Sequence, residues 1–402
     1  MNRERWNQAF ILVVLLALTI SFRLWNLEGT FWFKTDEGNN GYLALQILRE
    51  HKIILRGITS HFGAVAHYLT AGLFGLFGVN IFVLRLMPAM ISIITTLVCF
   101  LWVKKLAGIR AAILCSLLLL FSSWMIFYGR ISWEMSPNVL FVSLAAISTY
   151  TFIKNRKLTY AFLTGLFIGL AANGHLYIVM QALPFGLTLL LSKATWKHRV
   201  ATLLLAGAGG LLALTPLTLA TYQNNWDLFS NYRTSGAETA ARTLHGYILR
   251  LFGTVSQLAT TLGPTGFIAF IFAYAWAASI AARKSIVAIF FVVAIGIPIL
   301  LLPLVVSADP PVSEGRTICR TLSSIIGNQE CIPTKARYFD IIYPLPLILI
   351  AWWATRLTKK SLSAYLLLST LIILPGIPES YQFITRVEKW RIDRLIPVIQ
   401  QL

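Results

Sequence analysis

The chain has 402 residues, of which 57% are hydrophobic and only 12% are charged, and its mean hydropathy is +0.72. Soluble domains are nearer to about 25% charged, so the composition excludes an ordinary soluble protein. The formal net charge is +19, but Lys and Arg fall in short clusters between long apolar runs, as in membrane proteins. We therefore expect an all-α polytopic membrane protein and no nucleic-acid partner.

Eleven apolar runs of about 16–25 residues have the length needed to cross a bilayer. They lie near 8–26, 79–103, 109–128, 135–153, 158–173, 175–192, 199–221, 264–282, 285–306, 337–356 and 361–375. Two further apolar stretches, 64–78 and 246–262, would break the charge pattern if they crossed the membrane. We expect them to be interfacial helices on the extracytoplasmic face.

The basic clusters lie between every second pair of runs, which places them together in the cytoplasm. The opposite face then holds the larger polar segments 28–78, 222–262 and 307–336. We expect one transmembrane domain over 1–375 and a short extracytoplasmic tail over 376–402, in the plasma membrane. Met1–Phe22 has a basic start and no small-residue cleavage site after it, which predicts an uncleaved signal anchor with a cytoplasmic N-terminus.

Asp36 and Glu37 stand out because the chain has only 15 Asp and Glu residues in total. They follow the first apolar run directly and begin an expected helix over 36–48, in which Tyr42 and Leu45 share one side. One interpretation is a solvated loop or a helix N-cap, where Asp is favoured. The other is a catalytic base at the membrane surface.

Arg130 and Glu134 are four residues apart at the exit of the third run, the spacing of an ion pair on one helical face. Arginine so close to a bilayer is costly, so the pair is either functional or a structural clamp. Arg337 and Tyr338 begin the tenth run. Arginine suits bidentate phosphate binding, but Arg and Tyr are also common interfacial anchors. Arg85, at the start of the second run, carries the same two interpretations.

Cys319 and Cys331 lie in the third extracytoplasmic segment, where a disulfide is permitted, and two free thiols are the alternative. His61, His67 and His175 are expected on the same face. Together with the acidic pair they would offer ligands to a divalent metal. Their spacing fits no standard motif, so structural histidines stay an alternative and no cofactor is assigned.

Several short motifs occur in a fixed order along the chain. They are Asp36-Glu37-Gly38, Phe74-Gly75-Leu76-Phe77-Gly78, Arg85-Leu86-Met87-Pro88, Tyr128-Gly129-Arg130-Ile131-Ser132-Trp133-Glu134, His175-Leu176-Tyr177 and Ala336-Arg337-Tyr338. With this ordered set the chain resembles the GT-C superfamily of polyprenyl-phosphate-sugar-dependent glycosyltransferases. The nearest branch is the bacterial and archaeal relatives of protein O-mannosyltransferases and lipid A aminoarabinose transferases. The resemblance covers residues 1–190 and the segment near 337, while 200–330 match in general layout only.

The resemblance implies a GT-C fold of about eleven transmembrane helices roofed by interfacial helices. It also implies inverting transfer of a sugar from a polyprenyl-phosphate carrier to a protein, lipid or glycan acceptor at the extracytoplasmic face. Asp36 matches the family's catalytic acid and is the expected general base, with Glu37 beside it. We expect Arg130, Arg337 and Arg85 to bind the donor phosphate. The candidates for binding sugar or acceptor are Glu134, Tyr42, His61, His175, Tyr177 and Tyr338.

One departure from the family concerns the segment after the acidic loop. Many relatives carry a Lys-Pro-Pro stretch there, where this chain reads Ser60-His61-Phe62-Gly63-Ala64. His61 or Arg56 would then have to replace the lysine. Two alternatives stay open: a flippase for a lipid-linked sugar, although the chain shows no inverted repeat, and a non-catalytic subunit that works with a partner.

Overall fold

The computed structural model describes residues 3–29, 35–58, 62–192, 195–224, 244–305, 341–359 and 361–378. Within these residues every regular element is a helix, apart from an isolated antiparallel bridge between Arg56 and Gly63. The expectation of an all-helical chain is therefore confirmed.

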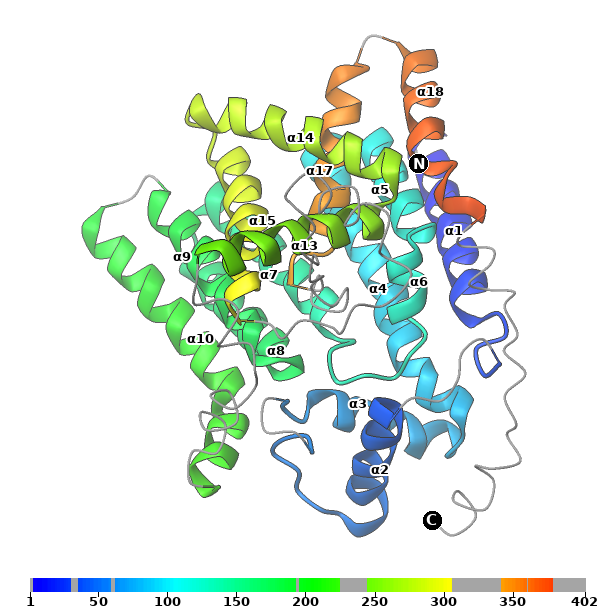
Figure 1. Ribbon diagram of the computed structural model, residues 1–402, viewed down its shortest axis with the longest axis vertical. Helices are drawn as coiled ribbons and strands as arrows, with labels where there is room; N and C mark the ends of the chain where they lie inside the picture. Colours follow the sequence, from blue (N-terminus) through cyan, green and yellow to red (C-terminus); the bar gives the residue numbers. More distant parts are fainter. Residues whose placement is uncertain are drawn as a thin grey trace.

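The helices occur close to the predicted positions. The first half contains α1 (Arg3–Leu24), α2 (Thr35–Glu50), α3 (Val65–Phe77), α4 (Ile81–Ala107), α5 (Ile109–Leu120), α6 (Ser123–Tyr128), α7 (Asn138–Asn155) and α8 (Leu158–Gly174). The second half contains the 3-10 helix η1 (Leu176–Gln181), α9 (Ala182–Leu191), α10 (Trp196–Gln223), α13 (Leu244–Leu262), α14 (Pro264–Ala282), α15 (Ile286–Val305), α17 (Leu345–Leu357) and α18 (Leu362–Ile373). Figure 1 shows α2 and α3 together at one end of the molecule, below the ends of α4 and α8.

Five of these helices are long and apolar enough to cross a membrane, so the chain is a multi-pass membrane protein. They span Trp6–Leu24, Ile81–Ala107, Trp196–Gln223, Pro264–Ala282 and Ile286–Pro303. Several other predicted spans are shorter apolar helices, such as α5, α8, α17 and α18. The eleven crossings expected from the sequence are thus not confirmed.

The predicted single helix over 109–128 is in fact two helices. Ser122 separates α5 from α6, because its Oγ accepts a hydrogen bond from the backbone nitrogen of Met125 at 3.2 Å and so caps α6. The pair Ser122-Ser123 inside an apolar run carries no clear break signal in the sequence, although serine is a favoured N-cap.

Helix α8 packs along α10 through small residues. A Cβ atom added to Gly165 would lie 1.7 Å from the carbonyl oxygen of Ala206, and one added to Gly209 would lie 2.2 Å from that of Phe162. Only glycine lets the two backbones approach so closely, as is common between helices in membranes.

Arg23 ties α1 to the helices beside it. Its Nε donates to Ser92 Oγ at 2.8 Å, and its Nη2 donates to the carbonyl of Leu119 at 2.8 Å, in the last turn of α5. Helix C-termini leave carbonyl groups unsatisfied, and a cation is favourable there. Arg23 is completely buried, so this capping anchors α1 against α4 and α5. Cys99 and Cys115 are buried free thiols in the main hydrophobic cluster of the helices.

Candidate active site

A buried ion pair fixes the first turn of α2. Glu37 accepts from Arg85 at both carboxylate oxygens, with Nε to Oε1 at 2.9 Å and Nη2 to Oε2 at 3.0 Å. Arg85 also donates through Nη1 to the carbonyl oxygens of Leu27 at 3.1 Å and Glu28 at 3.0 Å. The exposed fraction is 0% for Glu37 and 1% for Arg85. Two-bonded geometry of this kind is what makes a buried ion pair tolerable.

Asp36 lies in the same turn but in a different environment. It is one residue before Glu37 in the first turn of α2 and is only partly buried. The N-terminal turn of a helix favours a negatively charged side chain, because the backbone N–H groups there point outward. Of the two neighbouring carboxylates, Glu37 is thus enclosed by protein, while Asp36 is partly exposed.

A second polar network lies one turn further along α2. Asn40 Nδ2 donates to Thr70 Oγ1 at 3.0 Å and to Ser132 Oγ at 2.7 Å. Because an amide oxygen can only accept, His67 Nδ1 donates to Asn40 Oδ1, which lies 2.7 Å away. His67 is therefore the Nδ1-protonated tautomer. Its Nε2 has no hydrogen-bond partner among the described residues, and burial lowers the pKa of His67 to about 4.

Ser132 joins the two networks. Its backbone nitrogen donates to Glu37 Oε1 at 3.2 Å, and its hydroxyl accepts from Asn40. Glu37 and Asn40 are three residues apart on one face of α2. The loop between α6 and α7, which carries Ser132, is thus held to α2 at two points.

The same loop carries Arg130 and Glu134. Residues 129–137 are not α-helical, so the helical spacing predicted for this pair is wrong. Gly129 ends α6, and Pro137 precedes α7. Arg130 donates to the carbonyl of Phe22 at 3.3 Å and to that of Trp25, at the C-terminal end of α1.

Arg130 is completely buried and Glu134 is 3% exposed. Burial, with a smaller repulsion from Arg85, lowers the pKa of Arg130 to about 10. In this structure Arg130 binds the end of α1 and Arg85 binds Glu37. A phosphate role for either arginine stays a prediction.

His175 and Tyr177 lie together where α8 ends. Their rings are 4.5 Å apart, and Phe62 packs edge-on to His175 at 5.2 Å. The backbone nitrogen of Gly63 donates to the carbonyl of Asn173 at 2.6 Å. This bond holds the loop before α3 against the end of α8. Both predicted residues are buried beneath this loop.

Tyr42 is placed differently from the other candidates. It is 45% exposed, and its hydroxyl accepts from Gln46 Nε2 at 2.9 Å along the outer side of α2. Five predicted residues lie outside the described ranges, so the structure says nothing of them: His61, Arg337, Tyr338, Cys319 and Cys331. Within the described part of the chain, no three His, Cys, Asp or Glu side chains come together as a metal site requires.

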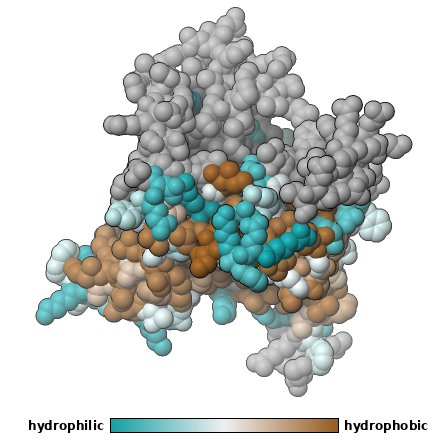
Figure 2. All heavy atoms as spheres, turned by 90° about the horizontal axis from the view of Figure 1, so that it is seen from below, coloured by the Kyte–Doolittle hydropathy of each residue, from teal (hydrophilic) through white to brown (hydrophobic). Residues whose placement is uncertain are grey.

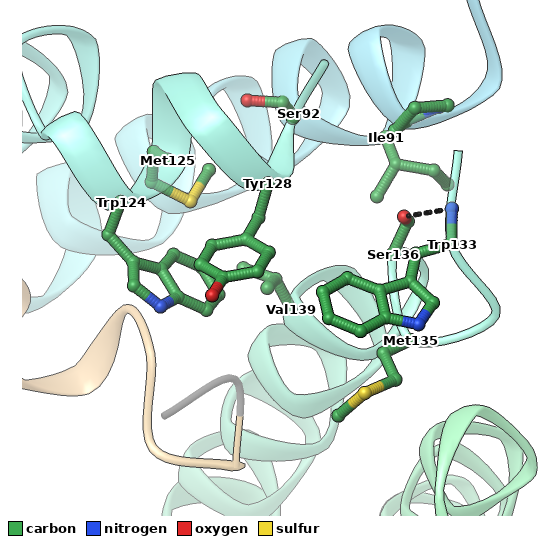
Figure 3. A pocket seen from close by; sticks show the side chains of 11 residues that line it. Ile91, Ser92, Trp124, Met125, Tyr128, Trp133, Met135, Ser136 and Val139 are labelled. Carbon is green, nitrogen blue, oxygen red and sulfur yellow. Dashed lines mark hydrogen bonds between the residues drawn. The ribbon is translucent and has the colours of Figure 1, made fainter. Parts of the chain in front are cut away.

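Two apolar hollows flank this end of the molecule. The smaller lies behind the loop between α6 and α7, where Figure 3 shows Trp124, Tyr128 and Trp133 lining it. Tyr128 lies 4.7 Å from Trp124 and 5.7 Å from Trp133, measured between ring centroids. These three rings form one aromatic side of the hollow.

The larger hollow, here called the α3–α10 groove, encloses about 1100 Å³ of empty space, part of it open to the outside. Its lining comes from the loop before α3, from α3 itself and from α8 and α10. The lining residues are Ile54, Leu55, Ala64, Val65, Tyr68, Leu69, Leu166, Leu170, Asn173, Leu212, Ala213 and Pro216. Figure 2, which looks at this end of the molecule, shows hydrophilic residues gathered between broad hydrophobic surfaces.

The two polar residues of the groove make hydrogen bonds within the protein, and its other ten lining residues are apolar. Tyr68 accepts at its hydroxyl from the backbone nitrogen of Ile54 at 3.1 Å. Asn173 Nδ2 donates to the carbonyls of Gly169 and Ala213, both at 3.0 Å. A peptide backbone or a sugar would lose hydrogen bonds in such a groove, whereas a hydrocarbon chain would not.

Residues 63–219 match the sequence model of the family described as "Dolichyl-phosphate-mannose-protein mannosyltransferase". The matched stretch includes Arg85, Arg130 and Glu134 and begins after Asp36 and Glu37. No curated protein matches the chain.

Solved structures share the fold at low sequence identity. The apo oligosaccharyltransferase of Archaeoglobus fulgidus superposes with a TM-score of 0.64 at 12% identity, over 96% of this chain and 57% of that one. The same enzyme, AglB, with an inhibitory peptide and a dolichol-phosphate gives a TM-score of 0.59 at 13% identity, over 96% and 56%. ArnT from Cupriavidus metallidurans bound to undecaprenyl phosphate gives 0.54 at 14% identity, over 100% and 81%. This chain thus spans a little over half of the oligosaccharyltransferase.

The class of protein is now defined: an all-helical, multi-pass membrane protein with the GT-C fold. Over residues 63–219 the chain is similar to the dolichyl-phosphate-mannose-protein mannosyltransferase family. The resemblance seen in the sequence, to polyprenyl-phosphate-sugar-dependent glycosyltransferases, is confirmed.

Proposed function

We propose that this protein is an inverting glycosyltransferase. It moves a sugar from a polyprenyl-phosphate carrier to a protein, lipid or glycan acceptor at the extracytoplasmic face of the membrane. The observation that carries the proposal is the division between two adjacent carboxylates. Glu37 is buried in its ion pair with Arg85, and Asp36, held by the same helical turn, is partly exposed.

In this proposal Asp36 is the general base, which takes the proton of the acceptor hydroxyl as that oxygen attacks the sugar. Glu37 and Arg85 fix the direction in which Asp36 points, because their two-bonded pair holds the turn that carries it. The leaving group is a phosphate, whose growing charge needs cationic or N–H donors nearby. Arg130 and Arg337 are the proposed phosphate ligands, and Glu134 and His175 are the proposed sugar or acceptor ligands.

The donor's polyprenyl chain would lie in the α3–α10 groove. Ten of its twelve lining residues are apolar, and Tyr68 and Asn173 already make hydrogen bonds within the protein. It continues onto the exposed side of α10, where Leu211 is 71% exposed and Leu212 is 60% exposed. Helix α10 is one of the candidate spans, so this side faces lipid chains, and a carrier can enter from the bilayer.

One experiment separates this proposal from the two alternatives. The purified protein is reconstituted in lipid vesicles with a panel of radiolabelled polyprenyl-phosphate monosaccharides and a membrane extract as the source of acceptor. A glycosyltransferase moves the label from the carrier to another molecule. A flippase leaves the label on the carrier but changes its leaflet, and a non-catalytic subunit does neither. Either of the last two results, from well-folded protein, would overturn the proposal.

A further inference from the structure

The hydrogen bonds of Asn40 single out a position that the proposed reaction does not by itself require. Asn40 uses both hydrogens of one amide group, one toward Thr70 on α3 and one toward Ser132 in the loop between α6 and α7. Asn40, Thr70 and Ser132 all have an exposed fraction of 0%. The two bonds thus share the donor Asn40 Nδ2 and are equally buried. They differ in the segment they attach to α2, which is helix α3 in one case and the loop between α6 and α7 in the other.

The bond to Thr70 joins two helices that are also joined by other contacts. Ala44 of α2 packs in one apolar cluster with Ala71 and Phe74 of α3. His67, on the same side of α3 as Thr70, is bonded to Asn40 as well. Loss of the Thr70 hydroxyl therefore leaves α3 in place against α2.

The bond to Ser132 holds a segment that is not α-helical. Residues 129–137 lack a helical hydrogen-bond ladder of their own, and Ser132 is held to α2 by its hydroxyl and by its backbone N–H. Arg130 and Glu134 lie two residues on either side of it. Glu37, the acceptor for that N–H, is the residue next to Asp36. Ser132 is therefore the point at which the loop is set against the turn that carries Asp36.

We infer that Asn40 and Ser132 are positioning residues that set the loop bearing Arg130 and Glu134 at a fixed distance from Asp36. This inference rests on the proposed function. A misplacement of reacting groups by about 1 Å can cost roughly a hundredfold in rate. In the proposed function, donor affinity comes mainly from the hydrocarbon chain in the α3–α10 groove, which neither Asn40 nor Ser132 lines. Loss of the Ser132 hydroxyl leaves its backbone bond to Glu37, so the loop would shift and not come free. The effect should therefore appear in kcat and not in KM for the donor.

The test compares Ser132→Ala with Thr70→Val in full-length protein reconstituted in lipid. Each variant removes one hydroxyl that accepts from the same amide nitrogen, so each leaves one buried N–H of Asn40 unsatisfied. Both should lower the midpoint of thermal unfolding by similar amounts. We expect Ser132→Ala to lower kcat at least about tenfold with KM for the donor within about twofold, and Thr70→Val to keep kcat within about twofold.

A third variant, Asn40→Ala, releases both hydroxyls and should reproduce the kcat loss of Ser132→Ala. Equal kcat losses in Ser132→Ala and Thr70→Val, following their losses of thermal stability, would overturn the inference and leave the proposed function standing. A change confined to donor KM would overturn it as well. If wild-type protein transferred no sugar from any donor, the proposed function and the inference would fall together.

Discussion

The buried pair of Glu37 and Arg85 allows a sharp prediction for the variant Glu37→Gln. The amide oxygen of glutamine can take the place of Oε1 and keep the bonds from Arg85 Nε and Ser132 N. Its NH₂ group then takes the place of Oε2 and faces Arg85 Nη2, another donor, at about the present 3.0 Å. One charge-assisted hydrogen bond is lost, worth about 1.5–3 kcal/mol, and a fully buried arginine loses its counter-charge.

Removing one member of a buried ion pair costs about 3–5 kcal/mol in all, and that is the destabilisation expected for Glu37→Gln. The assay is reversible unfolding in mixed detergent micelles, followed by circular dichroism. A double-mutant cycle with Arg85→Gln should give a coupling energy of at least about 2 kcal/mol. The exposed bond from Gln46 to Tyr42 serves as a control and should couple by less than about 0.5 kcal/mol. A loss below about 1 kcal/mol for Glu37→Gln would refute the reasoning.

Three further predictions follow from other parts of the molecule. Gly165→Ala should cost about 1–3 kcal/mol of stability, because its Cβ would meet the backbone of α10. In the control Gly186→Ala the Cβ meets nothing within 4 Å, so this variant should be neutral or slightly stabilising in thermal unfolding. Burial holds the folded-state pKa of His67 at about 4 instead of 6.5. The stability that its neutral form contributes is therefore complete above pH 6.5 and is lost as the pH falls toward 4. The expected loss is about 2 kcal/mol between pH 7 and pH 5. His67→Gln should remove this part of the pH dependence, and identical profiles of stability against pH for the variant and the wild type would contradict the prediction. Leu212→Trp should raise KM for the polyprenyl donor about tenfold by filling the groove, and Leu204→Trp, 68% exposed on the same helix but outside the groove, should leave it unchanged in a transfer assay.

Long apolar runs predicted most helix positions, because a run that fills a bilayer has few other ways to satisfy its backbone. The predicted helices over 264–282 and 36–48 correspond to α14 and α2. The break at Ser122 was not predicted from the apolar run, since the two serines Ser122 and Ser123 neither end nor begin a helix by composition alone. What makes it a cap is the position of its hydroxyl relative to Met125.

The candidate site was predicted in part. Asp36 and Glu37 could be singled out because acids are rare in this chain. Arg85 was a candidate for phosphate binding, and its pairing with Glu37 depends on bringing together residues 48 positions apart. Asn40 and Ser132 were missed as candidates because uncharged polar residues carry no distinctive signal. Asn40 lies three residues after Glu37, and Ser132 lies in the Tyr128–Glu134 motif. These positions become informative only once the structure places the loop against α2.

The central claim is that Asp36 is the base of a polyprenyl-phosphate-dependent sugar transfer. The measurement that tests it most directly is the rate of label transfer from the active donor by wild-type protein and by Asp36→Asn, with thermal unfolding of both recorded in the same lipid. We expect Asp36→Asn to keep the wild-type unfolding midpoint and to lose at least about a hundredfold in kcat, since the amide cannot take a proton from the acceptor. A variant that transfers the sugar at nearly the wild-type rate would contradict the account.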